Sequence, residues 1–218
     1  HDLGPHDNYH PLLERMFWAG FTPQVDGYIS LSATGRELAR TQHPRLERVP
    51  SKVVPHGHYR TAYPEPVARE EGRETLGIDD DVPVILYIGR IRPYKNVGRL
   101  IRAFKAMDMP RARLLVAGNP VSGALRESLQ YAAASDPHVR LDLRFIPTDL
   151  VPAYMAASDL VALPYDNVLH SGAALLALSF NRPVMVPARG AMRELQEYVG
   201  SSWVHTFDGR LLASKLED

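Results

Sequence analysis

The chain alternates between short apolar runs and longer stretches in which apolar positions recur with a helical period. The clearest example lies between residues 84 and 104. Val84–Ile88 is an unbroken apolar run, which is typical of a strand buried in a sheet. Residues 97–104 carry apolar side chains at the i, i+3, i+4 and i+7 positions, with charged side chains between them, which predicts an amphipathic helix. The pattern therefore predicts a buried strand, a loop and a helix in succession.

The same alternation continues to the end of the chain and precedes residue 84 in a shorter form. The expected strands lie near residues 25–31, 52–54, 84–88, 114–117, 139–145, 160–163, 184–186 and 203–207. The expected helices lie near residues 11–19, 34–40, 67–76, 97–104, 123–134, 150–157, 172–180 and 192–198, and the last eight residues look like a helix cut short. Strands that alternate with helices predict an α/β fold, here a Rossmann-like parallel sheet with helices on both faces.

A proline-containing stretch divides this alternation into two parts. Residues 59–66 hold two prolines and show neither period, as expected of a linker. We therefore expect a small N-terminal part, residues 1–60 with the linker, and a Rossmann-like domain formed by residues 61–218.

Composition limits the classes of function. The 218 residues include 25 Lys and Arg and 25 Asp and Glu, whereas a general nucleic-acid binder usually carries a basic excess. Cysteine is absent, which excludes disulfides and thiol chemistry and is compatible with a reducing cytoplasm. No apolar run approaches the roughly 18 residues of a membrane span. Because the sequence opens on a polar loop without an initiator methionine, we expect it to be a fragment or to lack an N-terminal part.

Two cations lie in the loop between the predicted strand 84–88 and the predicted helix 97–104. Arg90 and Lys95 would stand at the carboxyl end of a parallel strand, where open α/β sheets bind ligands, and beside a helix N-terminus. Arg binds two phosphate oxygens at once and Lys acts as a point charge, so the pair suits a diphosphate. The alternative interpretation is that both are solvated loop charges.

A second candidate anion site lies in residues 167–174. Ser171 fits the N-cap of the predicted helix 172–180, and Gly172 fits its first turn. The first amides of this helix would then bind an anion, although an ordinary capped helix explains the same residues. Candidate anion sites at two loops of one sheet edge support each other.

Histidines gather at two other places. Three lie within residues 1–10, where a metal site is conceivable, but Gly4-Pro5 interrupts any helix and no HExxH-type spacing appears, so a donor or base in a cleft is favoured. His56 and His58 flank Gly57 and either line a cleft between domains or belong to a hinge.

The motifs GxSxG and GxxxxGKS/T are absent and no convincing GxGxxG follows a strand, which argues against a serine hydrolase, a P-loop NTPase and an NAD dehydrogenase.

Several sequence blocks in a fixed order carry a resemblance to a known family. The blocks are His1-Asp2, VDGYISLSATGREL, KVVPHGHY, YIGRIRPYKNVGRLIRAF, LLVAGNP, RFIPTDLVPAYMAASDLVALPY and SGAALLALSFNRPVMVPARGAMREL. Together they run over nearly the whole chain, and the five-residue spacing from Arg90 to Lys95 fits the family's phosphate pair. The chain resembles the retaining glycosyltransferases of family 4, which have the two-domain GT-B fold.

This resemblance implies a role for each part of the chain. Residues 61–218 would form the domain that binds the nucleotide-sugar donor, and residues 1–60 would be the end of the N-terminal, acceptor-binding Rossmann-like domain. No metal or cofactor is implied, because cationic side chains and helix dipoles take its place. The UDP- or GDP-linked donor sugar is the substrate.

The resemblance also implies the residues of the site. Arg90 and Lys95 would hold the donor diphosphate, and the helix start at Ser171 and Gly172 would add backbone contacts. His1 would be the catalytic histidine of the N-terminal domain that faces the donor sugar. The surroundings of the base and ribose would be formed by Phe145, Ile146, Asp166 and Asn167.

One departure from the family's pattern concerns two glutamates, eight positions apart, that usually precede the Pro-Val strand. Alignment back from Pro183-Val184 places Val168 and Leu176 at these positions, so the carboxylate contacts to ribose and donor sugar do not carry over. Either the chain belongs to a divergent subfamily, or another polar side chain substitutes: Asp166, Asn167 or Ser171. The SGAALLALSF and PHGHY blocks resemble such a subfamily, associated with mannosyl transfer in polysaccharide or glycolipid assembly.

The expected function is hexosyl transfer from a nucleotide-diphosphate sugar to a saccharide or lipid-linked acceptor. We expect a cytoplasmic protein with peripheral contact at the inner face of the membrane through the N-terminal domain, and no nucleic-acid partner. Without most of an acceptor domain, this chain alone is expected to be inactive. The alternatives are a non-catalytic nucleotide-sugar-binding domain, which the missing glutamates would explain, and a GT-B-fold epimerase or phosphorylase.

Overall fold

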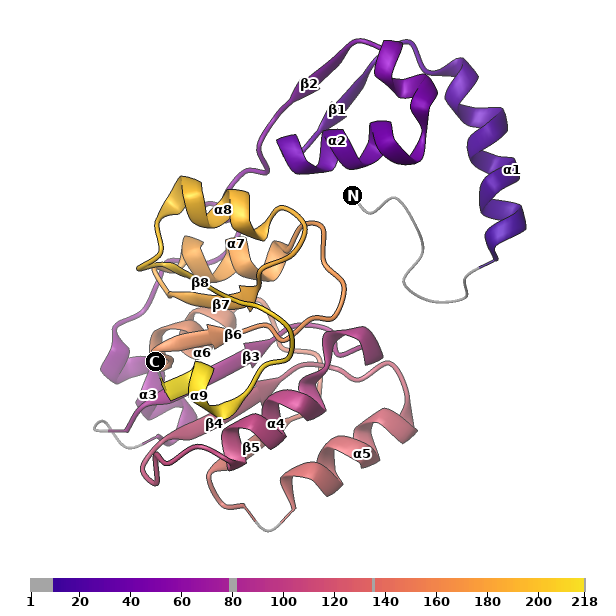
Figure 1. The fold of residues 1–218 in the computed structure, drawn as a ribbon. Helices are drawn as coiled ribbons and strands as arrows, with labels where there is room; N and C mark the ends of the chain where they lie inside the picture. Colours follow the sequence, from indigo (N-terminus) through magenta and orange to yellow (C-terminus); the bar gives the residue numbers. More distant parts are fainter. Residues whose placement is uncertain (1–9, 79–81, 135, 218) are drawn as a thin grey trace.

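Two parallel sheets of unequal size organise the chain. The computed structural model describes residues 10–78, 82–134 and 136–217. Strands β1 (Tyr28–Ser30) and β2 (Ser51–Val53) pair in parallel and form the smaller sheet. Figure 1 shows this sheet, with helices α1 and α2, at one side of a larger α/β body. The α/β class predicted from the sequence is confirmed.

Short turns limit the elements of the N-terminal part. In order they are α1 (Pro11–Phe21), the 3-10 turn η1 (Thr22–Gln24), β1, α2 (Ala33–Gln42), the 3-10 turn η2 (Pro44–Arg48) and β2. The strand predicted near 25–31 is only three residues long, because the chain bends at Asp26 before it and at Leu31 after it. Helix α2 begins at Ser32, whose Oγ accepts a hydrogen bond from the Gly35 amide at 2.8 Å, a normal N-cap contact.

The larger sheet has six strands, all parallel. They are β3 (Val84–Ile88), β4 (Arg113–Ala117), β5 (Val139–Asp142), β6 (Leu160–Ala162), β7 (Val184–Pro187) and β8 (Val204–Phe207), in the spatial order β5-β4-β3-β6-β7-β8. All five residues of β3 are buried, as its unbroken apolar run predicts. The chain moves outward from β3 to β5 and then returns to β6 on the other side of β3. The carboxyl ends of β3 and β6 therefore form the topological switch point, where such sheets bind ligands.

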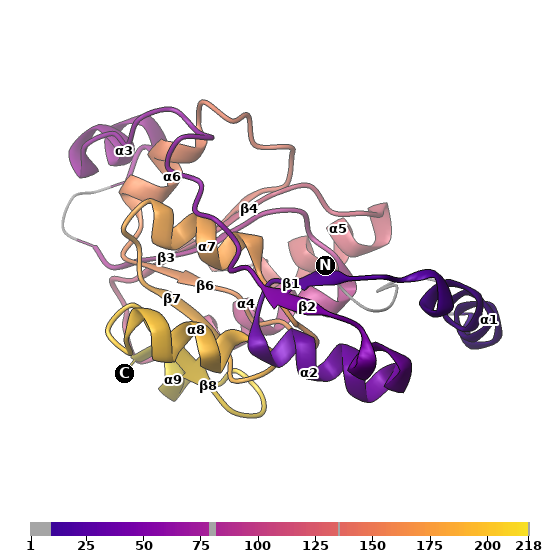
Figure 2. The ribbon, with the colours of Figure 1, turned by 90° about the horizontal axis from the view of Figure 1, so that it is seen from above.

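Helices cover both faces of this sheet (Figures 1 and 2). They are α3 (Arg69–Leu76), α4 (Val97–Lys105), α5 (Gly123–Ala133), α6 (Val151–Ala157), α7 (Gly172–Ser179), α8 (Met192–Val199) and α9 (Ala213–Glu217), with the 3-10 turn η3 (Pro93–Lys95) before α4. Right-handed crossovers place α4 and α5 on one face and α6, α7 and α8 on the other. Helix α9 packs on α4, and α3 packs on α6.

The strand predicted near 139–145 is wrong beyond Asp142. The amide of Arg144 donates to the Asp142 carbonyl at 3.0 Å, so a local turn replaces the ladder hydrogen bonds. Phe145 lies past this turn and its side chain is 74% exposed. The apolar alternation of the sequence therefore outlasts the strand.

An ion pair between a buried arginine and a partly exposed aspartate joins α3 to the amino ends of β3 and β6, at the edge of the sheet opposite the switch point. Arg73 of α3 is fully buried, and its Nη2 lies 3.2 Å from Asp159 Oδ2 and 2.9 Å from the Val82 carbonyl. Asp159 also accepts the Val84 amide at 2.8 Å and pairs with Arg69 at 2.6 Å. Removing the Asp159 carboxylate would take an ion-pair partner from a fully buried guanidinium, which should destabilise this edge of the sheet.

Candidate functional site

A cavity of about 560 Å³ lies at the carboxyl ends of the strands beside the switch point. The loops after β3, β4 and β5, the helices α6 and α7, and the segment between the two sheets all contribute to its lining. Most lining residues are apolar and a few are polar, and the volume lies within the range of small-molecule sites, about 300–1,000 Å³. The cavity thus has the size and composition of a binding site.

Bare backbone forms one wall of the cavity, where the loops after β3 and β4 meet. Gly89 and Gly118 both line the cavity and both have positive φ, +133° and +150°. A Cβ on Gly118 would lie only 1.9 Å from the Gly89 carbonyl oxygen. Beyond the strands the two loops stay paired, since the Ile91 amide donates to the Asn119 carbonyl at 3.0 Å. Glycine is therefore required here for the close approach of two backbones.

The two predicted cations lie at this wall. Arg90 lines the cavity, and its carbonyl accepts a hydrogen bond from the buried Tyr87 hydroxyl at 3.2 Å. Lys95 ends the turn η3, with its Nζ 3.9 Å from the position of a Cβ on Gly89 and 5.3 Å from the Tyr165 ring centroid. The structure thus brings one cation to the cavity and the other to the back of its glycine wall.

The surroundings of the Lys95 ammonium group favour the binding of an anion beside it. Burial, followed by the positive charges of Arg92 and Arg90, lowers the pKa of Lys95 to about 8. Its contact with the face of the Tyr165 ring offsets part of the cost of burying the charge. An anion bound beside Arg90 and Lys95 would relieve the repulsion between them and raise the pKa of Lys95 again.

The N-terminus of α7 also lines the cavity. Gly172 and Ala173, the first two residues of this eight-residue helix, line the cavity. Ser171 is buried and caps the helix, with its Oγ accepting from the Ala174 amide at 3.2 Å, as its sequence predicts. The first amides of a helix bind anions, so this helix start adds an uncharged anion-binding element to the two cations.

The segment between the two sheets adds two tyrosines to the cavity lining, Tyr59 and Tyr63, of which the sequence pointed only to Tyr59 as a residue of a cleft or hinge. The Tyr59 amide donates to Ser179 Oγ at 2.9 Å, and the Tyr59 hydroxyl lies 3.1 Å from the position of a Cβ on Gly172. Tyr63 packs edge-on against both Tyr59 and Phe180, with ring centroids 6.2 and 6.0 Å apart. The only signal for Tyr63 in the sequence is its place four residues after Tyr59, in a stretch without periodicity.

Phe145 and Ile146 line the cavity from the loop after β5, where the resemblance places the base. A polar cluster fixes the start of this loop. The Asp142 carboxylate accepts hydrogen bonds from Arg144, at 2.7 Å, and from the Tyr154 hydroxyl. Burial, followed by the hydrogen bond with Asp142, raises the pKa of Tyr154 to about 12, so its hydroxyl remains a donor at neutral pH.

Two predicted residues lie away from this cavity's lining. Asp166 and Asn167 are exposed, and the Asp166 carboxylate pairs with Arg99 at 2.8 Å. Hydrogen bonds from Asn96 and then Arg99 lower the pKa of Asp166. The Asp166 carbonyl accepts from Arg189 at 2.7 Å. The structure therefore uses Asp166 to join the loops after β3, β6 and β7. The predicted catalytic His1 lies outside the described residues.

The positions where the family's pattern would place glutamates are apolar in structure as well as in sequence. Leu176 lines the cavity, and Val168 is buried. The loop that holds Val168 is pressed against the loop after β7, because a Cβ on Gly190 would lie 2.2 Å from the Val168 carbonyl oxygen. This side of the cavity therefore offers shape and backbone groups in place of carboxylates.

The histidines near the linker line a second cavity, of about 710 Å³, between the N-terminal part and helices α7 and α8. His56, His58 and His170 all contribute to its lining.

Within the described ranges, no group of three His, Cys, Asp or Glu side chains is placed to hold a metal ion. In the part of the chain that the structure describes, every helix is too short or too polar to cross a membrane.

The chain is similar to several known glycosyltransferase sequences. The chain is 33% identical over 164 residues to the GDP-mannose:glycolipid 4-beta-D-mannosyltransferase of Xanthomonas campestris pv. campestris, a match that covers 75% of this chain and 44% of the relative. It is 33% identical over 161 residues to the D-inositol 3-phosphate glycosyltransferase of a Mycobacterium species (strain KMS), covering 67% of this chain and 36% of the relative. The matches thus span less than half the length of these relatives.

Solved structures share the fold at lower identity. Anabaena Alr3699/HepE in complex with UDP and glucose superposes with a TM-score of 0.79 at 20% identity, over 99% of this chain and 59% of that protein. Sucrose-phosphate synthase from Thermosynechococcus elongatus superposes with a TM-score of 0.76 at 20% identity, over 99% of this chain and 55% of that protein. Both similarities concern the fold.

A family profile settles the wider relationship. The profile described as "Glycosyl transferases group 1" matches residues 82–217, which is more than half of the chain and includes the six-stranded sheet. Together with relatives at 33% identity, this match shows that the chain belongs to the group 1 glycosyl transferases.

Proposed function

We propose that the chain is the donor-binding part of a glycosyltransferase that moves a hexosyl group from a nucleotide-diphosphate sugar to a saccharide or lipid-linked acceptor. The observation that carries the proposal is the cavity at the switch point. Arg90 and the first two residues of α7 line it, and Lys95 lies behind its glycine wall. Two cations and a helix start at one cavity suit a diphosphate.

The proposed chemistry follows from where charge develops. When the bond between the sugar and the diphosphate breaks, negative charge grows on the leaving phosphate. Fixed cations and helix amides stabilise this charge more in the transition state than in the ground state, which lowers the barrier. The apolar lining, which includes Ile88, Ile146 and Leu176, excludes water and strengthens these interactions.

We further propose a GDP-linked mannose as the donor. The support is the 33% identity to a relative whose name specifies GDP-mannose and a glycolipid. A solved neighbour of similar fold holds UDP and glucose, so UDP-linked sugars are the comparison to test. By the same reasoning we propose a role in polysaccharide or glycolipid assembly, in the cytoplasm at the inner face of the membrane.

The N-terminal part is the proposed end of an acceptor-binding domain, with the boundary near residue 60. Its small parallel sheet, β1 and β2, supports this proposal, because it is separate from the six-stranded sheet. His1 is the proposed catalytic residue of this domain on the strength of the sequence resemblance. Transfer would need the whole acceptor domain, so we expect no turnover from the 218-residue chain. Detectable transfer by this chain would contradict that expectation.

Binding tests the site directly. We expect GDP to raise the melting temperature of the chain, and Arg90→Ala to weaken GDP affinity by about 10- to 100-fold, because a hydrogen bond to a charged group contributes about 1.5–3 kcal/mol. Lys95→Ala should act in the same direction. Arg102→Ala, an exposed cation on α4 away from the cavity, is the matched control and should bind GDP normally. Unchanged GDP affinity in both site variants would contradict the assignment.

The apolar residues at Val168 and Leu176 favour one alternative function, a domain that binds nucleotide sugars without catalysis. A turnover assay on the full-length protein, with GDP- and UDP-sugars and lipid-linked acceptors, separates the two. Sustained release of nucleoside diphosphate, dependent on the acceptor, would exclude the binding-only function. Binding without release over the whole panel would exclude the transferase.

We propose that the transfer needs no bound metal, because Arg90, Lys95 and the start of α7 already oppose the diphosphate charge. Turnover by the full-length protein should persist in EDTA. A loss of activity that added magnesium restores would contradict this proposal.

A further inference from the structure

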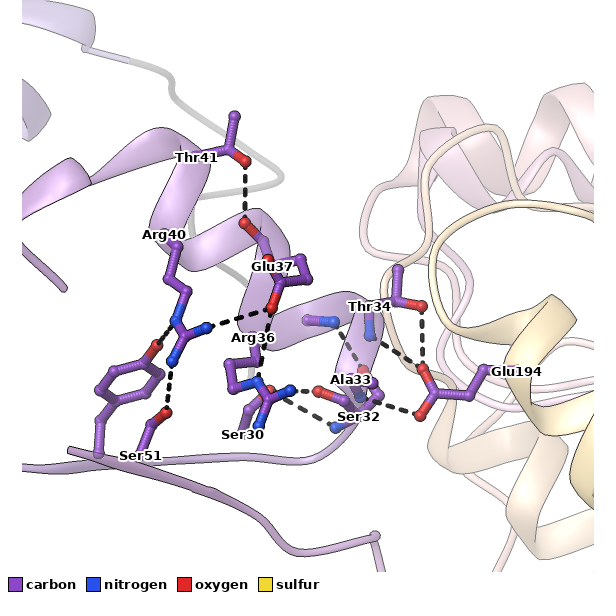
Figure 3. Close-up of polar contacts among 12 residues, drawn as sticks. Ser30, Ser32, Ala33, Thr34, Arg36, Glu37, Arg40, Thr41, Ser51 and Glu194 are labelled. Atoms are coloured by element: carbon purple, nitrogen blue, oxygen red, sulfur yellow. Dashed lines mark hydrogen bonds and ion pairs between the residues drawn. The ribbon is translucent and has the colours of Figure 1, made fainter. Parts of the chain in front are cut away.

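A carboxylate on α8, a helix that covers the six-stranded sheet, caps helix α2 of the N-terminal part (Figure 3). Glu194 lies on α8, and its Oε1 accepts the Ala33 amide at 2.9 Å. Its Oε2 accepts both the amide and the hydroxyl of Thr34, each at 2.9 Å. A carboxylate at a helix N-terminus satisfies amides that have no partner within the helix and interacts favourably with the helix dipole.

The pKa shift of the Glu194 carboxyl agrees with this geometry. Burial alone would raise its pKa, but the hydrogen bonds from Thr34 and Ala33 outweigh burial and hold the pKa of Glu194 below its usual value. The carboxylate is therefore the form that α2 stabilises, and it accepts three hydrogen bonds from a single helical turn.

A second contact lies beside the first. His170 Nε2 and Ser32 Oγ are 2.8 Å apart, and the same Ser32 hydroxyl caps α2 through the Gly35 amide. A Cβ on Gly35 would lie 3.1 Å from His170 Cε1, so the first turn of α2 rests on the histidine ring without room for a side chain. The start of α2 is thus bound to the larger domain at two points.

One of the two points adjoins the cavity at the switch point, and the other is tied to it through a backbone hydrogen bond. His170 directly precedes Ser171, the cap of α7, whose first two residues line the cavity. The amide of Ala191, which precedes α8, donates to the Leu169 carbonyl at 2.9 Å. The loop before α7 and the start of α8 therefore hold each other, and α2 is docked on both.

Elsewhere the N-terminal part and the larger domain are separated by the second cavity, of about 710 Å³, which Ser32, His56, His170 and Glu194 all line. Small polar contacts between two units usually permit relative motion. In such an arrangement a few hydrogen bonds at one edge determine the relative orientation of the two units.

From this we propose that Glu194, supported by His170, is a positioning residue that fixes the N-terminal part over the anion-binding loops. Its consequence for turnover rests on the proposed glycosyl transfer, whereas its effect on the arrangement of the two units does not. Loss of the Glu194 cap frees the N-terminal part to move about the segment around Gly57, while the cavity at the switch point stays formed. Donor binding is then kept, and the presentation of the acceptor to the donor is lost.

The absence of cysteine permits a direct distance measurement. Spin labels on Gln42→Cys, at the exposed end of α2, and on Ser201→Cys, in the exposed turn after α8, report the distance between the units. The doubly labelled protein with Glu194 intact should give one narrow distribution of distances by double electron–electron resonance. Glu194→Ala should add a population at other distances, with the ratio of docked to undocked protein reduced on the order of tenfold. Glu197→Gln, an exposed carboxylate on the same helix, is the control and should leave the distribution unchanged.

A second variant acts from the other side of the contact. Ala33→Pro removes one donor to Glu194 and suits the first position of α2, because Ser32 before it is extended. It should broaden the distribution less than Glu194→Ala, and it keeps the test valid if Glu194→Ala fails to fold. Distributions identical to the unsubstituted protein in both variants would overturn the proposal.

Kinetics of the full-length protein separate positioning from a general loss of stability. Glu194→Ala should lower kcat at least tenfold with little change in the KM for the nucleotide sugar, and Glu194→Gln should lie between it and the unsubstituted protein. A parallel rise in the donor KM would show that the donor cavity itself had changed and would overturn the proposal. If the protein transfers no sugar at all, the proposed function fails, and the distance measurement still decides the role of Glu194.

Discussion

The loop after β3 and the loop after β6 stand on the two sides of the switch point, yet they are built to oppose an anion in different ways. Residues 89–96 hold Arg90, Arg92 and Lys95, and the helix that follows, α4, separates charged from apolar side chains. Residues 163–171 hold no Lys or Arg, and α7 has no charged residue among its eight. One loop offers side-chain charge and the other offers backbone amides.

This difference suits the proposed binding of a diphosphate by a cavity whose lining holds no Asp or Glu among the described residues. Side-chain cations provide strong attraction that depends on protonation and on salt. The helix start provides a weaker attraction that is fixed in direction and does not titrate. An apolar helix such as α7 can be packed closely around the cavity, so its surface determines the shape of the ligand that fits while its first turn contacts the charge.

The largest effect in this comparison is expected at Gly118, since the first loop depends on backbone contact with it. Gly118→Ala should lower the free energy of unfolding by about 3 kcal/mol or more, because its φ is +150° and the new Cβ would meet the Gly89 carbonyl. Chemical denaturation measures the change. Gly123→Ala, whose Cβ would meet nothing within 4 Å, is the control, and equal losses in the two variants would contradict the account.

The next effect is a pH dependence that only the first loop can produce. Lys95 is protonated below its pKa of about 8 and loses its charge above it, whereas bound diphosphate favours the charged form. GDP affinity should therefore fall as pH rises above 8, by up to about tenfold per pH unit, with a proton taken up on binding. Calorimetry in buffers of different ionisation enthalpy measures this uptake.

The lowered pKa of Lys95 in the folded chain should also make the free energy of unfolding depend on pH when no ligand is bound. Its pKa is lower in the folded than in the unfolded chain, so the unfolded chain binds more protons between about pH 8 and 10.5, and the contribution of Lys95 to stability rises with pH there. Lys95→Arg should abolish both dependences, because Arg stays charged. A GDP affinity independent of pH in the unsubstituted chain would place the lysine outside the binding site.

The smallest effect is expected at the cap of the second loop. Ser171→Ala should cost about 1 kcal/mol of stability, the usual contribution of an N-cap, and should weaken GDP binding severalfold by loosening the first turn of α7. Ser122→Ala is the matched control, since Ser122 caps α5 in the same way and lies outside the cavity lining. Equal GDP affinities for the two variants would show that the α7 start takes no part in binding.

The two loops also show how much a sequence can reveal. Strands such as β3 are read from unbroken apolar runs, because a strand buried on both faces needs no polar position. The candidate anion residues Arg90 and Gly172 were found because loops at the carboxyl ends of parallel strands share one sheet edge, and both line the same cavity. Whether they bind a diphosphate stays a prediction.

The remaining features depend on contacts between distant residues. Phe145 continued an apolar alternation, so it was assigned to a strand that ends three residues earlier. Tyr59 and Tyr63 lie in a stretch without period, and only packing against α7 gives them a place at the cavity. Glu194 and Ala33 are 161 residues apart, and a cap from another domain leaves no local pattern.

A crystal structure of the chain with GDP bound is the most direct test of the central claim, that the two loops share one diphosphate. We predict phosphate oxygens within hydrogen-bond distance of the Arg90 guanidinium or the Lys95 ammonium on one side and of the Gly172 or Ala173 amide on the other. The base would lie near Ile146. A diphosphate that contacts neither cation, or one that lies in the cavity between His56 and Glu194, would contradict the account.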